Sequence, residues 1–525
     1  MKDICLQDKF NCLILAVMVL LLNACQSSKP DNYISFPENG AKNVNPDTHL
    51  VLNFKSKPTL GARGKIKVYD ASTDELVDSL DLSIPAGPTI PNKVKVPYIP
   101  SPYVYGPSTR TNANTVPGTP SGGAEPNLNE YQLTIIGGFT DAFHFYPVIV
   151  SDTTATIYLH HNLLEYGKTY YVLIDPEVLE VHDGSFNGIS DKNEWRFTTK
   201  PSAPSEELTK IIVSADGFGD FNTVQGAIDF IPDDYEKRMT IFIMNGVYQE
   251  IVYFRNKSNV TFLGESRDGV LVQYANNEVF NPHPQNIATN EMKGTFPSRR
   301  AVFAADNSTG IHLINLTILS LNDRPAQAEG LLMNGERNIV KNVVVHGSGD
   351  ALQVNGAVYL EDVEIKGFGD NVLGRGPAFF RNCELITTHG PHMWIRNTHA
   401  NHGNVFVNCI FRMEGDEETT IARTNDNRKG GYPYCEAVLL NCKLHGIRTE
   451  GWGIDGKGIS NIHYWEYNSV NLDGSPTDVS QRHPLSRQLK MDEDSLIIKN
   501  YSDPAYVLGG WNPKLDMQDA ALNDF

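Results

Sequence analysis

The sequence predicts an all-β protein in which a right-handed parallel β-helix follows an Ig-like β-sandwich. The chain contains 43 Gly and 30 Pro among its 525 residues, a content typical of turn-rich β architectures. Long amphipathic helical patterns are hard to find, whereas a pattern led by asparagine recurs along the second half of the chain. At this length one ordinary core is too small, so two or more domains are expected.

The first residues have the features of a secretion signal and are set apart from the fold. Lys9 precedes an uncharged apolar stretch from Leu13 to Leu22, which is short for a membrane span of about 20 residues. The stretch ends in Leu-Asn-Ala-Cys25, which resembles the lipobox of bacterial lipoproteins. This resemblance implies a signal peptide over residues 1–24 and a lipid on Cys25. We therefore expect a membrane-anchored protein of the cell envelope, in the outer membrane or at the cell surface; an ordinary signal peptide or a short anchor is the alternative.

The charge of the chain argues against one class of partner. The formal net charge is -18 at pH 7, and it is unchanged by removal of residues 1–24, which carry two Lys and two Asp. Such a protein is a poor candidate for binding nucleic acid or another polyanion through its overall field. A local cleft could still accept neutral, esterified sugar units. For the oligomeric state, a monomer is the default expectation.

Residues 25–200 predict the β-sandwich. Short alternating stretches, such as residues 49–54, are separated by turn signals, as in sandwiches. Residues 36–40 and 195–199 resemble the opening and closing segments of bacterial immunoglobulin-like domains. A stretch rich in Pro, Gly, Ser and Asn between Pro85 and Pro126 predicts a long insertion. This domain shows no catalytic constellation, so we expect a spacer or accessory module, with carbohydrate binding as the alternative.

Residues 207–525 contain an internal repeat. Its pattern is an apolar residue, a variable residue, Asn or Asp, a small apolar residue or Cys, and then alternating apolar positions. It occurs around Asn259, Asn315, Asn342, Asp362, Asn382, Asn408 and Asn441. From the second of these onward the intervals are 27, 20, 20, 26 and 33 residues. Short β-rich repeats of this period predict a solenoid whose coils cover one another's apolar faces.

The cysteines of this region fit the same repeat. Cys383, Cys409 and Cys442 directly follow repeat asparagines, so we expect them to stack in the interior as inert packing residues. No cysteine belongs to a CxxC pair, which argues against a structural zinc site. No metal or other cofactor is expected.

A series of motifs runs through the repeat region in a distinctive order. They occupy residues 213–225, 246–250, 327–331, 347–352, 367–374, 421–423, 451–452 and 509–513. Together, and in this order, they resemble the pectin methylesterase (pectinesterase) family of carbohydrate esterases. The resemblance covers essentially all of residues 207–525. It implies a parallel β-helix enzyme that hydrolyses the methyl esters of polygalacturonate, the homogalacturonan of pectin, to pectate and methanol.

The spacing of two aspartates supports this chemistry independently. Asp350 and Asp370 are 20 residues apart, one repeat interval in this region. One solenoid turn therefore places them on neighbouring coils, about 4.8 Å apart between strands. Two carboxylates at that distance do not both ionise easily, so one keeps its proton near neutral pH. An arginine beside the charged carboxylate would decide which one that is.

The resemblance assigns a role to each site residue. Asp370, kept ionised by Arg423, is the nucleophile, and Asp350 is the general acid and then the general base. Gln327 donates a hydrogen bond to the oxyanion. Trp452 stacks on a sugar ring. The structural alternatives are turn-forming aspartates, an Arg423 that pairs with residues 416–418 at the surface, and a Trp452 that packs under a loop.

The sequence also departs from the family pattern near these residues. Gly349 stands where the family has its second oxyanion glutamine, and Gln353 or a backbone N–H would have to replace that donor. Asn371-Val372-Leu373 lacks the aromatic residues that follow the family's nucleophile, and Thr424 follows the arginine where the family has Pro-Trp. These changes suggest an altered substrate preference.

Three other functions are alternatives to methyl ester hydrolysis. An esterase for another pectin ester, such as acetyl groups, would use the same aspartate pair in a reshaped pocket. A glycan-binding surface lipoprotein would keep the fold without the catalysis. A pectate lyase would need clustered carboxylates for Ca²⁺, and no such cluster surrounds Asp350 and Asp370.

Overall fold

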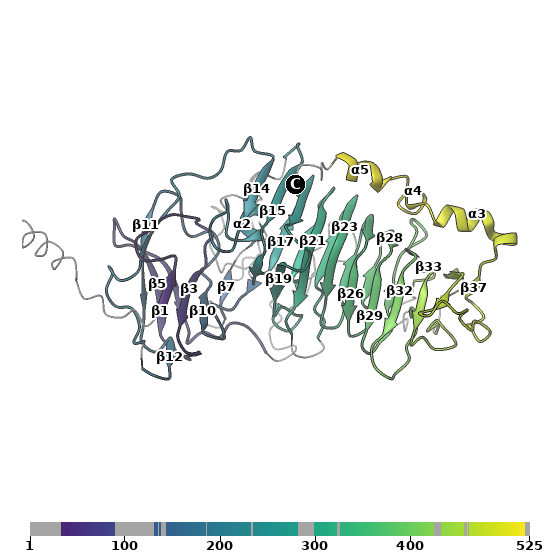
Figure 1. Cartoon of the computed structure of the whole chain (residues 1–525), viewed down its shortest axis with the longest axis horizontal. Coiled ribbons are helices and arrows are strands. Elements are labelled where there is room, and N and C mark those ends of the chain that lie inside the picture. The colour runs from purple at the N-terminus through teal and green to yellow at the C-terminus, as the bar shows by residue number, and fades with distance from the viewer. Residues whose placement is uncertain are drawn as a thin grey trace, which may run out of the picture.

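The computed structural model describes residues 33–89, 131–134, 136–137, 143–184, 186–232, 235–281, 299–322, 326–424, 432–455, 459 and 461–519. The expected signal peptide, Cys25 and most of the expected insertion between Pro85 and Pro126 lie outside these residues. Figure 1 shows two parts arranged end to end, a small sandwich followed by a long stack of parallel strands. In the part of the chain that is described, no helix has the length and apolar character needed to cross a membrane.

The first part consists of two facing sheets. One has the order β1 (Tyr33–Phe36), β3 (Leu50–Phe54), β10 (Thr154–Ile157), β9 (Val148–Ser151), and the other β2 (Ala41–Val44), β13 (Arg196–Thr199), β11 (Thr169–Ile174), β5 (Lys65–Asp70), β6 (Leu76–Asp81). Two short pairs, β4 (Pro58–Leu60) with β12 (Leu179–Val181) and β7 (Leu133–Thr134) with β8 (Phe143–His144), complete it. Alternate side chains point inward, as in β5, and build a core around Trp195 and Phe197. The alternation of apolar and polar residues that predicted these strands therefore corresponds to alternating buried and more exposed side chains.

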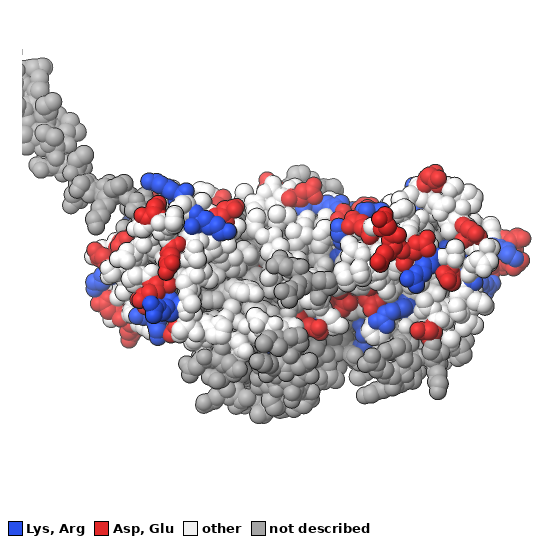
Figure 2. Space-filling model, turned by 90° about the horizontal axis from the view of Figure 1, so that it is seen from below, with Lys and Arg blue, Asp and Glu red and all other residues white. Residues whose placement is uncertain are grey.

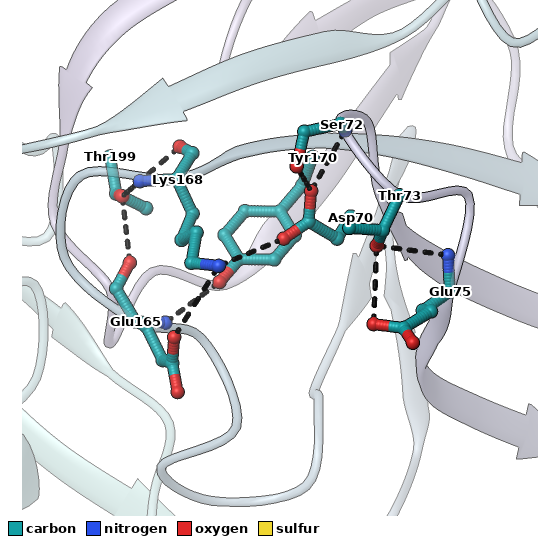
Figure 3. Close-up of polar contacts among 8 residues, drawn as sticks. All are labelled: Asp70, Ser72, Thr73, Glu75, Glu165, Lys168, Tyr170 and Thr199. Atoms are coloured by element: carbon teal, nitrogen blue, oxygen red, sulfur yellow. Dashed lines mark hydrogen bonds and ion pairs between the residues drawn. The ribbon is translucent and has the colours of Figure 1, made fainter.

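A tyrosine near the start of β11 belongs to a group of polar contacts in this sandwich (Figure 3). The hydroxyl of Tyr170 accepts a hydrogen bond from the backbone N–H of Glu165, at 2.8 Å. Thr199 of β13 donates to the carbonyl of Glu165 at 2.7 Å, and Lys168 forms an ion pair with Asp70 at 3.2 Å. A buried tyrosine bonded to the backbone a few residues upstream is typical of immunoglobulin-like sandwiches.

The second part is a parallel β-helix, as the repeat predicted. The strands of the coils stack in three columns, and β21 and β23 each run through the first and second columns. The first column contains β14 (Lys210–Val213), β15 (Met239–Ile243), β18 (Val260–Gly264), β21 (His312–Ser320), β23 (Asn338–His346), β25 (Val358–Glu361), β28 (Ala378–Arg381), β31 (Asn404–Val407), β33 (Glu436–Leu440), β35 (His463–Tyr467) and β37 (Arg487–Gln488). The second contains β16 (Gly246–Tyr248), β19 (Val270–Tyr274), the later halves of β21 and β23, β26 (Glu364–Gly367), β29 (Glu384–Thr387), β32 (Ile410–Met413), β34 (Lys443–His445) and β36 (Val470–Asn471). The third contains β17 (Val252–Arg255), β20 (Phe303–Asp306), β22 (Leu331–Asn334), β24 (Leu352–Val354), β27 (Val372–Gly374) and β30 (Met393–Ile395).

From Asn315 onward, the repeat asparagines and Asp362 mark the bend between the first and second columns. Asn259 instead lies directly before β18, where a coil enters the first column. Each residue at this bend has a positive φ, from 52° at Asn342 to 57° at Asn315. Asn and Asp tolerate this left-handed region better than other residues with a Cβ. The side chains also bond along the stack, because the amide of Asn342 donates to Asn315 at 2.9 Å. The sequence pattern is therefore the signature of one recurring backbone turn.

The cysteines of the repeat behave as predicted. Cys383, Cys409 and Cys442 are free and buried inside the coils. The backbone N–H of Cys383 lies 3.4 Å from the sulfur of Cys409, one coil away. They pack as small apolar residues in the solenoid interior.

Three helices at the C-terminal end were not predicted. α3 (Met491–Tyr501), α4 (Pro504–Val507) and α5 (Pro513–Asp519) run along one edge of the stack, drawn in yellow in Figure 1. α3 and α4 bury Ile498, Tyr501 and Val507 against the outward face of the first column. That face carries a ladder of apolar side chains, including the stacked rings of Tyr359 and Phe379. The helices therefore remove a hydrophobic outer surface from water.

The sandwich is packed against the first coil of the β-helix. The buried helix α2 (Val224–Phe230) covers this end of the stack. Asp47 of the sandwich accepts hydrogen bonds from the backbone N–H groups of Asn222 and Thr223, at 2.9 and 2.8 Å, just before that helix. Buried polar contacts of this kind fix an orientation because breaking them leaves donors unpaired. The first domain is thus docked on the second.

The surface charges agree with the acidic composition. Figure 2 shows one face of the molecule, on which the described Lys and Arg side chains lie among Asp and Glu side chains. On this face they do not form a continuous basic area such as binds a nucleic-acid backbone.

Candidate active site

Three carboxylates occupy equivalent positions on three consecutive coils of the third column. Glu329, Asp350 and Asp370 each lie two residues before a strand, namely β22, β24 and β27. The first residues of these strands are paired in register across the sheet. Neighbouring strands are about 4.8 Å apart, so the three acids form a stack at one edge of the sheet. The 20-residue interval thus predicted the neighbouring positions of the two aspartates correctly.

Asp370 is held by Arg423, as expected. The guanidinium donates from Nε to Oδ1 and Oδ2 at 2.9 and 3.0 Å and from Nη2 to Oδ2 at 2.5 Å. Arg423 belongs to the second coil beyond Asp370, where a bridge joins Met393 to Ala422. It therefore aligns with Trp394, and its guanidinium carbon lies 4.2 Å from the centre of that ring. The side chain of Arg423 thus passes over the Trp394 ring, on the intervening coil, to reach the carboxylate of Asp370.

Asp350 is held by an arginine that the sequence analysis missed. Arg300 precedes β20 and is 8% exposed. Its Nη2 donates to Oδ2 of Asp350 at 2.9 Å. The same guanidinium binds both oxygens of Glu329, with Nε at 3.0 and 2.7 Å and Nη2 at 2.6 Å. Glu329 is fully buried, so water screens the attraction between these two charges less than it does at the surface.

The environment of Asp350 favours its protonated form. Burial raises the pKa of its carboxyl to about 7, and the charges of Glu329 and Asp370 act in the same direction. Arg300 and Arg396 oppose this shift. Asp350 therefore keeps its proton near neutral pH, beside an Asp370 that is paired with Arg423. Two carboxyl groups in this arrangement can supply an acid and a nucleophile.

Gln327 lies at the exposed edge of this cluster. Its Oε1 accepts a hydrogen bond from Nη1 of Arg300. That bond directs the amide so that Nε2, which carries two N–H donors, is the end left for a ligand. Gln327 is thus placed near Asp350, as an oxyanion donor requires.

The structure explains why no side chain stands at position 349. Gly349 has φ of 120°, and a Cβ there would lie 1.9 Å from the carbonyl oxygen of Ala326. The turn before Asp350 therefore excludes a glutamine. Gln353, which was considered as a replacement, lies inside β24 and is 3% exposed.

The structure contradicts the substrate-stacking role of Trp452. Its side chain is 1% exposed, it stacks on Tyr464 with ring centres 4.7 Å apart, and its indole N–H donates to Glu466 at 2.9 Å. The bridge between Arg423 and Gly453 aligns Trp452 with Ala422, whose side chain points into the coil. Trp452 is therefore a core residue, which was the structural alternative.

We expect Trp452→Phe to lower the free energy of unfolding by about 1–3 kcal/mol, because it leaves a small cavity and removes a buried hydrogen bond. The KM for the substrate should stay unchanged. Thermal unfolding and steady-state kinetics measure the two effects. Trp394→Phe is the matched control: it alters the ring under Arg423 and should lower kcat with a smaller loss of stability. A raised KM for Trp452→Phe with unchanged stability would restore the stacking role.

Comparisons with known proteins point to one family. A family model described as Pectinesterase matches residues 210–502. "Pectinesterase QRT1" of Arabidopsis thaliana is 26% identical over 62% of this chain and 86% of its own length. "Pectinesterase 2" of Olea europaea is 30% identical over 54% of this chain and 77% of its own length. This chain spans half of another relative, "Probable pectinesterase/pectinesterase inhibitor 42" of Arabidopsis thaliana, at 25% identity.

Two solved structures also align with the β-helix part. The pectin methylesterase from carrot has a TM-score of 0.47 at 19% identity, over 60% of this chain and 98% of that one. Pectin methylesterase PemA from Erwinia chrysanthemi has a TM-score of 0.44 at 21% identity, over 57% of this chain and 97% of that one.

Proposed function

Because the chain belongs to the pectinesterase family, we propose that it hydrolyses the methyl esters of polygalacturonate to pectate and methanol. One observation carries the proposal: Asp370, bound by Arg423, lies one coil from Asp350, whose pKa of about 7 keeps it protonated near neutrality. The same pair of side chains thus supplies a nucleophile and an acid.

The first half of the reaction forms an acyl-enzyme. An oxygen of Asp370 attacks the carbonyl carbon of the methyl ester, and the carbonyl electrons move to the oxygen. The Nε2 donors of Gln327 stabilise this oxyanion. When the tetrahedral intermediate collapses, the bond to the methoxy group breaks and Asp350 gives its proton to the departing oxygen. Methanol leaves, and the sugar stays attached to Asp370 as an anhydride.

The second half restores the enzyme. Asp350, now ionised, takes a proton from a water molecule, and the water oxygen attacks the acyl carbon. The bond to Asp370 breaks, and its carboxylate returns to Arg423. The sugar leaves as a free carboxylate, and Asp350 holds the proton for the next cycle.

The test is methanol release from highly methylated pectin by purified residues 26–525, with acetate release from acetylated pectin measured in parallel. We expect methanol. Acetate without methanol would support the second candidate, an esterase for acetyl groups, which the lack of aromatic residues at positions 371–373, directly after Asp370, favours. If neither product appears, binding of pectin fragments by calorimetry decides for a glycan-binding protein.

We further propose that the mature protein is a lipid-anchored envelope protein, with the sandwich between the membrane and the β-helix. The Leu-Asn-Ala-Cys25 segment supports this. Bacteria that produce the full chain should incorporate a labelled fatty acid into it, and Cys25→Ser should abolish the label. Cys12→Ser, within the expected signal peptide, is the control and should leave the label unchanged. Label retained in Cys25→Ser would contradict anchoring through this residue.

A further inference from the structure

We propose that Arg300, held by Glu329, is a positioning residue of this site that orients both the Asp350 carboxyl and the Gln327 amide. This inference rests on the proposed ester hydrolysis and deepens it. It also explains how the site works with a glycine at position 349, where the family pattern has a second oxyanion donor.

The first step of the argument is that Arg300 cannot rotate freely. Its Nε and Nη2 grip both oxygens of Glu329, at 2.6 to 3.0 Å, and Glu329 is fully buried. A guanidinium is planar and carries five N–H donors in a fixed fork. Fixing one edge of the fork therefore fixes the directions of the remaining donors, which point to Asp350 and Gln327.

The second step concerns the proton of Asp350. Because Nη2 of Arg300 donates to Oδ2 at 2.9 Å, that oxygen serves as the acceptor. The proton of the neutral carboxyl is then carried by Oδ1. Oδ1 is thus the atom that gives its proton to the departing methoxy oxygen.

The third step is the charge of the pair. A lone arginine beside Asp350 would favour its ionised form and remove the acid. The charged groups that act on Asp350 are Arg300 and Arg396 on one side, and Glu329 and Asp370 on the other. Glu329 offsets the charge of Arg300, so the site gains a rigid donor without losing the proton. This accounts for a buried acid on the coil before the catalytic pair.

The fourth step concerns the oxyanion. A Cβ at Gly349 would collide with the backbone, so Gln327 is left as the side-chain donor of the family's type. Arg300 holds Oε1 of Gln327 and polarises its amide. A polarised amide is a stronger N–H donor. The single, well-oriented amide of Gln327 can then provide part of the oxyanion stabilisation that two glutamines provide in the family pattern.

The experiment compares Arg300→Gln with Glu329→Gln. For each variant, kcat and KM for methanol release are measured from pH 5 to 10, together with the melting temperature. We expect kcat at the optimum to fall at least about tenfold in both variants, with KM within about threefold. The alkaline limb of the kcat profile should move in opposite directions, by about one pH unit: downward in Glu329→Gln, which removes a negative charge, and upward in Arg300→Gln, which removes a positive one.

The control is Arg255→Gln. Arg255 forms a comparable ion pair with the buried Asp306 on the same sheet, at 2.9 Å, away from the catalytic acids. It should lower the melting temperature and leave the alkaline limb in place. A purely structural Arg300 would behave in the same way.

The outcomes separate this inference from the proposed function. An active wild type whose limb moves in neither variant, or in the same direction in both, overturns the positioning role alone. A wild type that releases no methanol overturns the proposed function and this inference with it. If a glutamine variant does not fold, Arg300→Lys is the variant to measure, because it keeps the positive charge but loses the planar set of guanidinium N–H donors. For Arg300→Lys we expect the alkaline limb of the kcat profile to stay at its wild-type pH and kcat to be at least about tenfold lower. Full activity in this variant would overturn the inference.

Discussion

Asp370→Asn is expected to lower kcat for methanol release by at least about 10³-fold, because an amide does not attack the ester carbonyl in place of a carboxylate. The substitution is close to isosteric. Asp370 has φ of 48°, a left-handed conformation that asparagine also adopts, so the backbone should not change. Methanol release and the melting temperature are measured on the same preparation.

The matched control is Asp362→Asn, the same change eight residues earlier. Asp362 also has a positive φ, 56°, but it belongs to the ladder of repeat asparagines at the bend of the coil. Asn382 of the next coil bonds to it at 3.4 Å, and an asparagine fits this ladder at the other positions. We expect full activity in this control. More than one tenth of the wild-type kcat in Asp370→Asn would exclude Asp370 as the nucleophile.

The β-helix could be predicted because the bend between its first and second columns requires a particular type of residue, which recurs in the sequence. From β21 onward, each bend between the first and second columns holds a left-handed residue, so Asn or Asp recurs at this point of the coil, as at Asn342, Asp362 and Asn382. The helices α3 to α5 have no such recurring residue. They are short, and they are stabilised by the outward ladder around Tyr359 and Phe379 on distant coils, which becomes visible only when the strands are stacked.

The proximity of the two aspartates could be predicted for the same reason, whereas only part of their surroundings could. Asp350 and Asp370 are one repeat apart, so their proximity follows from the period. Glu329 precedes Asp350 by 21 residues, close to the same interval, and this signal was available. Arg300 lies on an earlier coil outside any motif, and its partners come from two other coils. Contacts of this kind depend on the three-dimensional stack.

The prediction for Trp452 was wrong because direction cannot be read from a two-residue motif. In a strand, neighbouring side chains point to opposite faces, so a shift of one residue exchanges inside and outside. The bridge at Gly453 places Trp452 in line with inward residues. Trp394, which contacts Arg423, holds the outward position on its coil.

Asp350→Asn should abolish the acid and the base together and lower kcat on methylated pectin by about 10²- to 10⁴-fold. In the wild type, burial raises the pKa of Asp350 to about 7, so its proton is lost as the pH rises through this value. The wild-type kcat should therefore fall above about pH 7, where methoxide would have to leave without a proton. The variant has no such group, and this limb should vanish from its pH profile.

A nitrophenyl ester of galacturonate separates the two roles of Asp350, because nitrophenolate departs without being protonated. In Asp350→Asn the first step on this ester should remain fast, while the acyl group on Asp370 waits for a base to activate water. Stopped-flow absorbance should show a burst of about one nitrophenolate per enzyme followed by slow turnover. Asp370→Asn should show no burst. A variant at position 350 that loses equal activity on both esters, without a burst, would show that Asp350 shapes the site rather than transferring protons.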